Sequence, residues 1–255
     1  QNKKGKTRLD ELLVEKRLVE SRSQAKALIL AGHVLVGGHV IDKAGAAIGP
    51  DQEISIKEKQ KYVGRGGLKL EKAINEFGID VTGCVCVDVG ASTGGFTDCL
   101  LQHGAKKVYA IDVGYGQMHW RLQSDPRVVR MDRENFRYFD VSRITDPVEI
   151  VVMDVSFISA KLLVPKVVEF FRTSQTGPAS LTGQKFILLI KPQFEAGPEF
   201  VGKGGIVRDD AVRQKVVRDV VAVLEKNKFT EIKSCESPIT GADGNVEYLA
   251  YGRLI

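Results

Sequence analysis

Long apolar runs are missing from this sequence of 255 residues. A helix that crosses a bilayer needs about 18 or more consecutive apolar residues, and no segment approaches that length. The N-terminal run QNKKGKTR also lacks the apolar core of a secretory signal peptide. The sequence therefore predicts a cytoplasmic protein without a membrane segment. Because the first residue is Gln1 and not Met, we expect part of the N-terminus to be missing.

Cysteine is scarce as well: the chain has four, which is too few for a disulfide framework at this length. Cys84 and Cys86 alternate in a short apolar run, Cys99 follows on the next expected helix, and Cys235 is distant in sequence. No His or Cys has the spacing of a second ligand pair, so no metal site is predicted. We expect reduced, buried thiols.

The excess of positive charge is small, +5, from 37 Lys and Arg against 32 Asp and Glu. Such an excess favours a polyanionic partner only weakly. The basic residues are nevertheless clustered in two segments: Lys3, Lys4, Lys6 and Arg8, then Lys57, Lys59, Lys61, Arg65, Lys69 and Lys72. Two interpretations stay open for these clusters, a solvated tail and linker or a nucleic-acid surface.

The segment 84–101, CVCVDVGASTGGFTDCLL, indicates a ligand-binding turn. It opens with apolar residues typical of a buried strand, continues with a glycine-rich turn and ends in an apolar-periodic helix. In α/β sheets this arrangement places a ligand at the carboxyl end of the strand. The spacing differs from the dinucleotide fingerprint G-x-G-x-x-G, because Ala91-Ser92-Thr93 separates Gly90 from Gly94.

Asp112 ends the next strand-like run, 107–112, where a carboxylate can accept hydrogen bonds from ribose hydroxyls. A ligand with a ribose and no phosphates fits this combination, and S-adenosylmethionine is such a ligand. The alternative on this segment alone is a nucleotide fold that binds NAD or no ligand.

Residues up to about 60 have a separate pattern of two short helices followed by small strands. Ser21 is the expected N-cap of the second helix, 22–31. The runs 33–36 and 40–41 flank a Gly-Gly turn, which predicts a hairpin. The first helix is marked by leucines at helical spacing: Leu9, Leu12, Leu13 and Leu18.

The run from Arg8 to Ile41 resembles the S4 RNA-binding domain, a small αα-β module found in ribosomal protein S4, pseudouridine synthases and tyrosyl-tRNA synthetases. The matching motifs are RLD at 8–10, SRSQA at 21–25 and AGHV at 31–34. Many members have an Asn-Gly turn where this chain has His33 to His39, so RNA readout by the hairpin is left open. Arg65, in the basic segment that follows, is an alternative RNA contact. The RNA-facing residues that the resemblance implies are Arg8, Arg17, Arg22, Ser23 and Lys26.

Beyond residue 60, strand and helix patterns alternate, which predicts a Rossmann-like α/β domain with a mostly parallel, seven-stranded sheet. We therefore expect two domains, a small α+β domain at 1–60 and an α/β domain at 61–255. Residues 174–183 are expected to form a surface loop, and the glycine-rich connection 194–210 a lid or substrate contact. The expected strands lie near 84–89, 107–112, 127–131, 148–154, 185–191, 229–236 and 246–252. The expected helices lie near 68–77, 95–103, 115–123, 159–171 and 209–227.

Charged residues follow several expected strands, at the edge where α/β sheets form their sites. Asp154 and Lys191 each come at the end of an apolar strand, Glu247 lies in the last strand region, and Lys69 lies on the helix before the first strand. A lysine directly after an apolar strand needs a paired carboxylate or a function. The alternatives are a Lys191 side chain that leaves the strand end for solvent and an outward-facing Glu247.

Residues 61–255 resemble the FtsJ-like methyltransferases that act on RNA ribose. With the S4 domain, the chain resembles the TlyA family, also called haemolysin A-like ribosomal RNA methyltransferases. The matching motifs are YVGRGGLKL, DVGASTGGFTDCLL, MDVSFIS, IKPQFE, VGKGGIVRD and GNVEY. The resemblance implies S-adenosylmethionine as the cofactor and 2′-O-methylation of a cytidine in 23S, and sometimes 16S, ribosomal RNA. The expected partner is therefore ribosomal RNA or a ribosomal subunit.

The same resemblance implies a catalytic tetrad of Lys69, Asp154, Lys191 and Glu247. A ribose hydroxyl is a weak nucleophile, so Lys191 would accept its proton, with Asp154 and Lys69 orienting the amine. Glu247 would hold the second lysine or the hydroxyl. The implied cofactor contacts are Asp88, Gly90, Ser92, Gly94, Gly95, Phe96 and Asp112, with Asp132 and Asn135 near the adenine.

Motifs that the chain lacks argue against two other kinds of methyl transfer, to an amino group of a base and to carbon 5 of a base. The chain has Asp154-Val155-Ser156-Phe157 where base amino-methyltransferases have Asp/Asn-Pro-Pro-aromatic, and no cysteine is placed for carbon-5 methylation. Two other functions are alternatives: a pore-forming haemolysin, which needs membrane-active segments that the sequence lacks, and an RNA-binding protein with an inactive methyltransferase fold. The intact tetrad argues against the second. The oligomeric state stays open.

Overall fold

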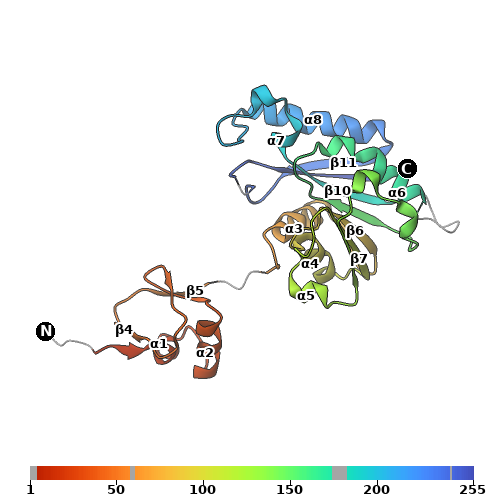
Figure 1. The fold of residues 1–255 in the computed structure, drawn as a ribbon. Helices are drawn as coiled ribbons and strands as arrows, with labels where there is room; N and C mark the ends of the chain where they lie inside the picture. The colour runs from red at the N-terminus through yellow and green to blue at the C-terminus, as the bar shows by residue number, and fades with distance from the viewer. Residues whose placement is uncertain (1–4, 58–60, 174–182, 242) are drawn as a thin grey trace. The chain divides into compact units, whose positions relative to one another are not determined.

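The structure, a computed structural model, describes residues 5–57, 61–173, 183–241 and 243–255. The chain divides into two compact units, residues 1–60 and 61–255 (Figure 1). Apart from Gly183, the loop expected at 174–183 lies outside the described residues.

The first unit contains two helices that close a small core over short strands. The apolar faces of the helices supply most of its fully buried residues, among them Leu9 and Ile29, and β2 adds Val34. Ser21 caps α2 as predicted, because its Oγ accepts a hydrogen bond from the backbone N–H of Gln24 at 3.2 Å. The predicted hairpin is formed by β2 and β3, and β5 pairs with the other edge of β2. The elements are β1 (Thr7–Arg8), α1 (Leu9–Glu15), α2 (Arg22–Leu30), β2 (Val34–Val36), β3 (His39–Val40), β4 (Ala47–Ile48) and β5 (Ile54–Ile56).

The second unit is built on a sheet of seven strands in the order β11-β12-β10-β9-β6-β7-β8. In this sheet every neighbouring pair from β10 to β8 is parallel, and β12 runs antiparallel to both β10 and β11. The predicted mostly parallel, Rossmann-like sheet is therefore confirmed. Its strands are β6 (Val85–Val89), β7 (Lys107–Asp112), β8 (Val128–Asp132), β9 (Ile150–Met153), β10 (Lys185–Ile190), β11 (Phe229–Glu236) and β12 (Tyr248–Leu254).

Helices cover both faces of this sheet. Residues of α3 (Gly66–Phe77), α4 (Gly95–Gln102) and α5 (Trp120–Gln123) belong to one buried cluster, and residues of α6 (Val164–Thr173) and α8 (Asp210–Lys226) belong to the other. Successive strand residues alternate between the two clusters, as the pleat of a strand requires.

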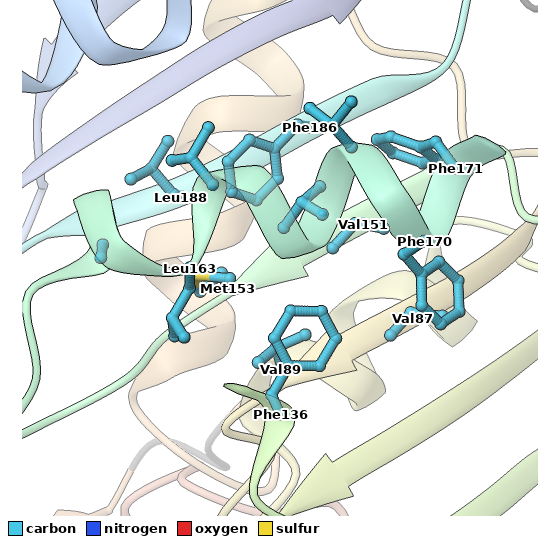
Figure 2. Packing of buried hydrophobic residues seen from close by; sticks show 14 of the residues in the cluster. Val87, Val89, Phe136, Val151, Met153, Leu163, Phe170, Phe171, Phe186 and Leu188 are labelled. Carbon is cyan, nitrogen blue, oxygen red and sulfur yellow. The ribbon is translucent and has the colours of Figure 1, made fainter. Parts of the chain in front are cut away.

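The core under α6 is rich in aromatic side chains. Figure 2 shows Phe170 and Phe171 of α6 beside strand residues such as Val87 and Phe186. All four are 0% exposed, and burial of an apolar side chain of this size contributes roughly 1.5–3 kcal/mol. This layer fixes the strands whose carboxyl ends carry the candidate site.

The helix expected at 115–123 is shorter in the structure, because α5 covers only Trp120–Gln123. The preceding segment is a loop held by the carboxylates of Asp112 and Asp132. Asp112 accepts a hydrogen bond from the N–H of Gly114 at 2.7 Å, and Asp132 accepts one from the N–H of Gly116 at 3.2 Å. The φ of Gly116 is +65°, a conformation outside the helical range.

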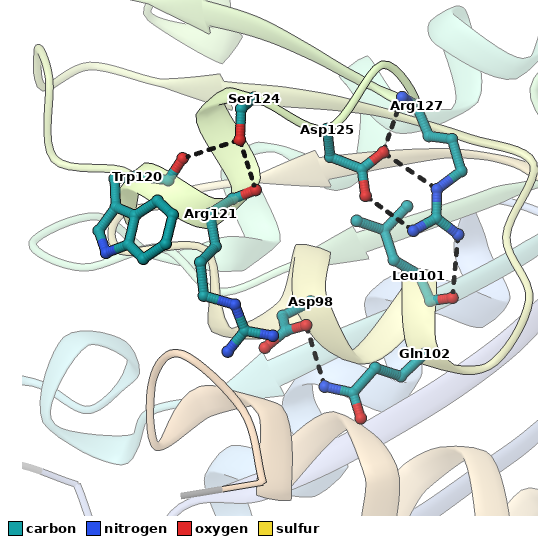
Figure 3. A network of polar contacts seen from close by, with 8 residues as sticks. All are labelled: Asp98, Leu101, Gln102, Trp120, Arg121, Ser124, Asp125 and Arg127. Carbon is teal, nitrogen blue, oxygen red and sulfur yellow. Dashed lines mark hydrogen bonds and ion pairs between the residues drawn. The ribbon is translucent and has the colours of Figure 1, made fainter. Parts of the chain in front are cut away.

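Polar contacts fix the turn from α5 into β8 (Figure 3). The Oγ of Ser124 donates to carbonyl oxygens of α5 at 3.3 and 3.4 Å. The guanidinium of Arg127 donates to both carboxylate oxygens of Asp125, at 3.0 and 2.7 Å, and to the carbonyl of Leu101 at 3.5 Å. The end of α4 is thereby joined to the start of β8.

Other boundaries also shift. The helix expected at 159–171 begins as a 3-10 turn, η3 (Ala160–Leu162), and α6 starts afterwards with Pro165 in its first turn, where the missing N–H costs nothing. Glu247 precedes β12 and is not within a strand. Short turns lie in the connections: η1 (Phe136–Tyr138), η2 (Val141–Arg143), α7 (Pro192–Glu195) and η4 (Pro198–Phe200).

Candidate active site

The candidate site lies at the carboxyl end of β6, where the chain order in the sheet reverses. The strands β7 and β8 continue on one side of β6, and β9 pairs on the other side. Ligands of open α/β sheets bind at such a switch point. The glycine-rich turn predicted from the sequence follows β6 directly.

Gly90 is required in this turn for two reasons. Its φ is +84°, and a Cβ at this position would lie 2.4 Å from the backbone oxygen of Asp154. The turn therefore passes directly against the end of β9. Ser92 also has a positive φ, +48°, which is uncommon for a residue with a side chain and is often found where a site is preorganised.

Gly94 is the N-cap of α4, and Gly95, its first residue, lies against a second glycine-rich segment. Gly94 has a φ of +94°, and a Cβ at Gly95 would lie 3.0 Å from the backbone N of Gly67 and 3.1 Å from the backbone O of Gly64. The segment that leads into α3 thus rests on the turn that follows β6. Phe96, the next residue of α4, is buried.

The carboxylate of Asp112 organises the opposite rim. One oxygen accepts a hydrogen bond from the N–H of Ser92, and the other accepts one from the N–H of Gly114, both at 2.7 Å. Asp112 thus joins the turn after β6 to the loop after β7. Each carboxylate oxygen keeps a further lone pair, so ribose hydroxyls could still donate to this group.

A cavity of about 530 Å³ opens beside this carboxylate. Its wall includes Gly90, Ser92, Asn135 and the apolar ring of Phe136, and its volume is in the range of small-molecule sites. The ionisable residues of the wall are all acidic: Asp112, Glu134 and Asp154. Among the described residues, no Lys or Arg lines the cavity. This lining disfavours a pyrophosphate and suits a cationic ligand with a ribose.

Several residues predicted to contact the cofactor are not part of this cavity wall. Gly95 and Phe96 line a smaller hollow of about 190 Å³ beside the cavity, together with Gly90 and Ser92. Gly94 is buried. Asp132 lies at the end of β8, and, unlike Asn135, it is outside the cavity wall.

Asp88 lies beneath the turn and is 0% exposed. One carboxylate oxygen accepts a hydrogen bond from Thr97 Oγ1 at 2.7 Å, and among the described residues the other oxygen has no hydrogen-bond partner. Burial, with a smaller contribution from the carboxylates of Asp154 and Asp112, raises the pKa of Asp88 to about 7, although the bond from Thr97 opposes the shift.

Asp154 and Lys191 meet across the ends of the parallel strands β9 and β10. The Nζ of Lys191 lies 2.7 Å from Oδ1 of Asp154, and the side chains are 12% and 21% exposed. This contact is an ion pair without hydrogen-bond geometry: among the described residues, no donor is aligned with Oδ1. The aligned bond of Nζ goes to Ser156 Oγ at 2.8 Å. Lys191 therefore does not leave the strand end for open solvent.

Lys69 and Glu247 form the second ion pair, with Nζ and Oε2 2.5 Å apart. Their side chains are 10% and 3% exposed, so Glu247 is not the outward-facing residue that the sequence left open. Both pairs are close to α3: Lys69 lies on it, and a Cβ added at its first residue, Gly66, would be 3.9 Å from Oδ2 of Asp154. The four predicted catalytic residues are thus arranged as two pairs around the start of one helix.

Two neighbours of this site were not predicted. Ser156 bonds to Lys191, and Phe157 is 91% exposed with a φ of +64°. The ring of Phe157 lies beside that of Phe194, with centroids 5.2 Å apart. The sequence does contain a signal for these two residues. Both follow shortly after Asp154 in the motif MDVSFIS, at the edge of the sheet where the candidate site lies.

In the first unit, the predicted RNA-facing residues fall into two groups. Arg17, Ser23 and Lys26 are exposed. Arg8 and Arg22 instead bind the fully buried Asp10, each with a nitrogen 2.9 Å from a carboxylate oxygen. Hydrogen bonds from Arg8 and then Arg22 hold the pKa of Asp10 well below its usual range, against the effect of burial. Both arginine side chains remain about half exposed, at 48% and 51%.

Arg65 belongs to the second unit, where it precedes α3. Its guanidinium donates a hydrogen bond to the carbonyl of Thr240 at 2.7 Å. The residue is exposed, so it could contact a ligand on the side of α3 that also holds Lys69.

The sequence pattern of the FtsJ-like methyltransferases matches residues 62–254. The chain belongs to this family. The pattern of the S4 domain matches residues 7–54. The family and the enzyme class predicted from the motifs, a methyltransferase preceded by an S4 domain, are therefore confirmed.

Relatives match nearly the whole of this methyltransferase. It is 46% identical to "Putative rRNA methyltransferase YqxC" of Bacillus subtilis, over 96% of this chain and 85% of that protein. It is 39% identical to "16S/23S rRNA (cytidine-2'-O)-methyltransferase TlyA" of Mycobacterium tuberculosis, over 97% of this chain and 90% of that protein. A solved structure, "Putative hemolysin from Streptococcus thermophilus", is similar with a TM-score of 0.72 and 41% identity, covering 98% of this chain and 89% of that chain.

Two further properties of the methyltransferase concern membranes and metals. Within the described residues, no helix combines the length and the apolar character that crossing a membrane requires. In the same part of the chain, no group of three or more His, Cys, Asp and Glu side chains is arranged to hold a metal ion.

Proposed function

We propose that this FtsJ-like methyltransferase transfers a methyl group from S-adenosylmethionine to the 2′-hydroxyl of a cytidine in ribosomal RNA. The names of its relatives support the substrate. The structural observation that carries the proposal is the Lys191–Asp154 pair at the edge of an acidic cavity. A ribosomal substrate would place this activity in the cytoplasm.

The cavity beside Asp112 fits the proposed cofactor. The Asp112 carboxylate would accept hydrogen bonds from the ribose hydroxyls, and Phe136 with Asn135 would contact the adenine. The acidic wall favours the positive charge of the sulfonium and amino groups over phosphates. S-adenosylmethionine supplies a methyl group that its sulfonium already activates. The remaining tasks fall to residues of the protein.

Lys191 is proposed as the group that accepts the proton of the ribose hydroxyl. In its neutral form Nζ would take the proton of the hydroxyl while the methyl group passes from the sulfonium sulfur to the hydroxyl oxygen, so that the bond to oxygen replaces the bond to sulfur. General bases in such sites perform this role. Asp154 and Ser156 hold Nζ at the strand end, 2.7 and 2.8 Å away. Orientation of this kind reduces the entropy cost of bringing the reacting atoms into line.

Lys69 and Glu247 are proposed to support the site without accepting this proton. Their ion pair is more deeply buried than that of Lys191 and Asp154. It ties α3, whose first residue Gly66 lies near Asp154, to the segment before β12. Loss of either partner would leave a buried, unpaired charge and displace the start of α3.

The S4 unit is proposed to bind the ribosomal RNA, with Arg17, Ser23 and Lys26 as direct phosphate contacts. Arg8 and Arg22 would reach phosphates from the fixed positions that Asp10 gives them. Arg65 would contact the RNA from the methyltransferase unit.

Labelled methyl transfer to ribosomal subunits tests this proposal. Purified protein would be incubated with S-adenosylmethionine and with small or large subunits from a strain that lacks the enzyme, and the modified nucleotide would be mapped. We expect 2′-O-methylcytidine with the wild-type protein and none with Lys191→Ala. Methylation of a base, or of no RNA at all, would contradict the proposal. An erythrocyte-lysis assay on the same preparation tests the haemolysin that the sequence left as an alternative.

A further inference from the structure

Glu195 is a buried acid that the proposed chemistry does not use. It is the last residue of α7, a single helical turn that directly follows Lys191. Its side chain is only 2% exposed. Burial raises the pKa of Glu195, against the opposing effect of its hydrogen bonds from Ser159 and Ala160. A buried carboxylate is costly unless its partners compensate it, so its contacts indicate what it stabilises.

Both carboxylate oxygens of Glu195 bind the loop after β9. Oε2 accepts a hydrogen bond from Ser159 Oγ at 2.5 Å, and Oε1 accepts one from the backbone N–H of Ala160 at 2.6 Å. The ammonium of Lys161 lies 3.5 Å from Oε2. These three contacts belong to the loop that starts at Asp154 and to the turn η3 that ends it.

The other end of α7 is Lys191. The N–H of Phe194 donates to the carbonyl of Lys191 at 2.9 Å, and the N–H of Ala196 donates to that of Pro192 at 2.9 Å. Because α7 is one turn long, Glu195 stands at a fixed distance from Lys191. The ring contact between Phe194 and Phe157 adds a second link between the same two loops.

We infer that Glu195 is a positioning residue that clamps α7 to the loop after β9 and thereby sets Lys191 against Asp154 and Ser156. The two loops follow the neighbouring parallel strands β9 and β10. The loop after β9 carries Asp154, and the loop after β10 begins with Lys191. Without the clamp, the two loops would be linked by the long side chain of Lys191 and by the ring contact between Phe157 and Phe194. The inference rests on the proposed function, in which Lys191 accepts the proton.

The test compares Glu195→Ala, Glu195→Gln and Glu195→Asp with a matched control, Glu199→Ala, which removes an exposed acid from the following turn, η4. Single-turnover methylation would be measured across pH, with separate titrations of S-adenosylmethionine and RNA. We expect Glu195→Ala to lower the rate roughly 10- to 100-fold, the range for a displaced catalytic group, and to change the pH dependence of the rate. Both affinities should stay within about twofold, a margin of roughly 0.4 kcal/mol.

The two conservative variants separate the effect of side-chain length from the effect of charge. Glutamine keeps the length and an acceptor for the N–H of Ala160, so Glu195→Gln should retain most of the rate. Aspartate is one methylene shorter, so Glu195→Asp should lose about as much as alanine. A wild-type rate in Glu195→Ala, or a loss with an unchanged pH dependence, would overturn the inference. Glu195→Asp keeps the carboxylate and serves if the alanine variant does not fold; a wild-type rate in this variant would equally overturn the inference.

Crystal structures of the wild type and Glu195→Ala give an independent result. The inference expects the distances from Lys191 Nζ to Asp154 Oδ1 and Ser156 Oγ to lengthen beyond hydrogen-bond range, and unchanged distances would contradict it. If the wild type methylates no ribosomal RNA, the proposed function fails, but these distances still decide the inference about Glu195.

Discussion

Lys191 Nζ lies 2.7 Å from Asp154 Oδ1, although its aligned hydrogen bond goes to Ser156. The amine is thus held between a charge and a hydroxyl at the ends of adjacent parallel strands. If Lys191 accepts the ribose proton, Lys191→Ala should lower the single-turnover rate by roughly 10²–10⁴. Cofactor and RNA affinities, measured in parallel titrations, should change little.

Lys191→Arg distinguishes a proton acceptor from a positive charge that holds the RNA. Guanidinium stays protonated at any working pH, so this variant should be as slow as Lys191→Ala. Lys203→Arg, an exposed lysine in the connection after η4, is the matched control and should keep the wild-type rate. Near wild-type methylation by Lys191→Arg would remove the proposed base.

Cofactor affinity should depend on Asp112, because its carboxylate holds both the turn after β6 and the loop after β7. Asp112→Ala should weaken S-adenosylmethionine binding at least tenfold, about 1.4 kcal/mol, in calorimetric titration. Gly90→Val should do the same, because a side chain there collides with Asp154. Asp140→Ala is the control: Asp140 also accepts a backbone N–H, at 3.0 Å from Ser142, but it lies away from the cavity. Wild-type affinity in the first two variants would move the cofactor site elsewhere.

RNA affinity should respond to charges on the S4 unit. Replacing Arg17 and Lys26 with Gln should weaken RNA binding and lower the slope of its salt dependence by about one unit for each phosphate that is no longer neutralised. Cofactor affinity should not change. Lys215→Gln on α8 removes a charge that is 67% exposed and should leave the slope intact. If the slope also survives the double substitution, the RNA surface must involve other residues, with Arg65 the next to test.

The Lys69–Glu247 pair should contribute strongly to stability because it is buried. Lys69→Met or Glu247→Gln leaves one charge unpaired and should lower the free energy of unfolding by about 3–5 kcal/mol. The double variant should cost less than the sum of the two. Urea unfolding can be followed by the fluorescence of Trp120, the only tryptophan in the chain. Lys72→Met breaks an exposed pair with Glu76 and should cost far less, because solvent screens exposed ion pairs. An equal cost at both sites would contradict the buried-pair explanation.

Asp88 should make stability fall as pH rises toward neutrality. Its pKa is about 7 in the folded protein against 3.8 for the free group. The stability that the protonated carboxyl provides is fully present below pH 3.8 and is lost as pH rises through 7, on the order of 4 kcal/mol in all. Asp88→Asn mimics the protonated form, so the stability of the wild type relative to this variant should decline across that interval.

Urea unfolding of both proteins at several pH values between 4 and 8 measures this decline. Asp140→Asn is the control, because hydrogen bonds from Ser142 lower the pKa of that exposed carboxyl and it stays ionised over most of the range. A constant difference between wild type and Asp88→Asn at every pH would contradict the raised pKa.

The sheet and the family could be predicted because their signals are local or sequential. Apolar runs bounded by glycines identified the strands, and ordered motifs identified an S4 domain followed by an FtsJ-like methyltransferase domain. The two ion pairs among Lys69, Asp154, Lys191 and Glu247 agree with the prediction that these residues converge. Their catalytic roles remain predictions.

The features that escaped prediction depend on contacts between distant segments. The loop before α5 is held by carboxylates at the ends of β7 and β8, so a helical pattern there was misleading. Arg8 and Arg22 bind Asp10 in the folded S4 unit, which motif comparison does not reveal. The contact of Glu195 with Ser159 joins residues 36 positions apart, and nothing in the sequence around either residue indicates it.

The pairing of Lys69 with Glu247 also constrains the order of events during synthesis. The two residues are separated by 178 positions, which a ribosome covers in roughly 9–36 s at about 5–20 residues per second. Throughout that interval α3 would carry a lysine whose partner has not been made. In its last part β10 would exist without its neighbour β12. The nascent domain therefore cannot complete either its sheet or its active site until its last strand leaves the ribosome, the particle that we propose as its substrate.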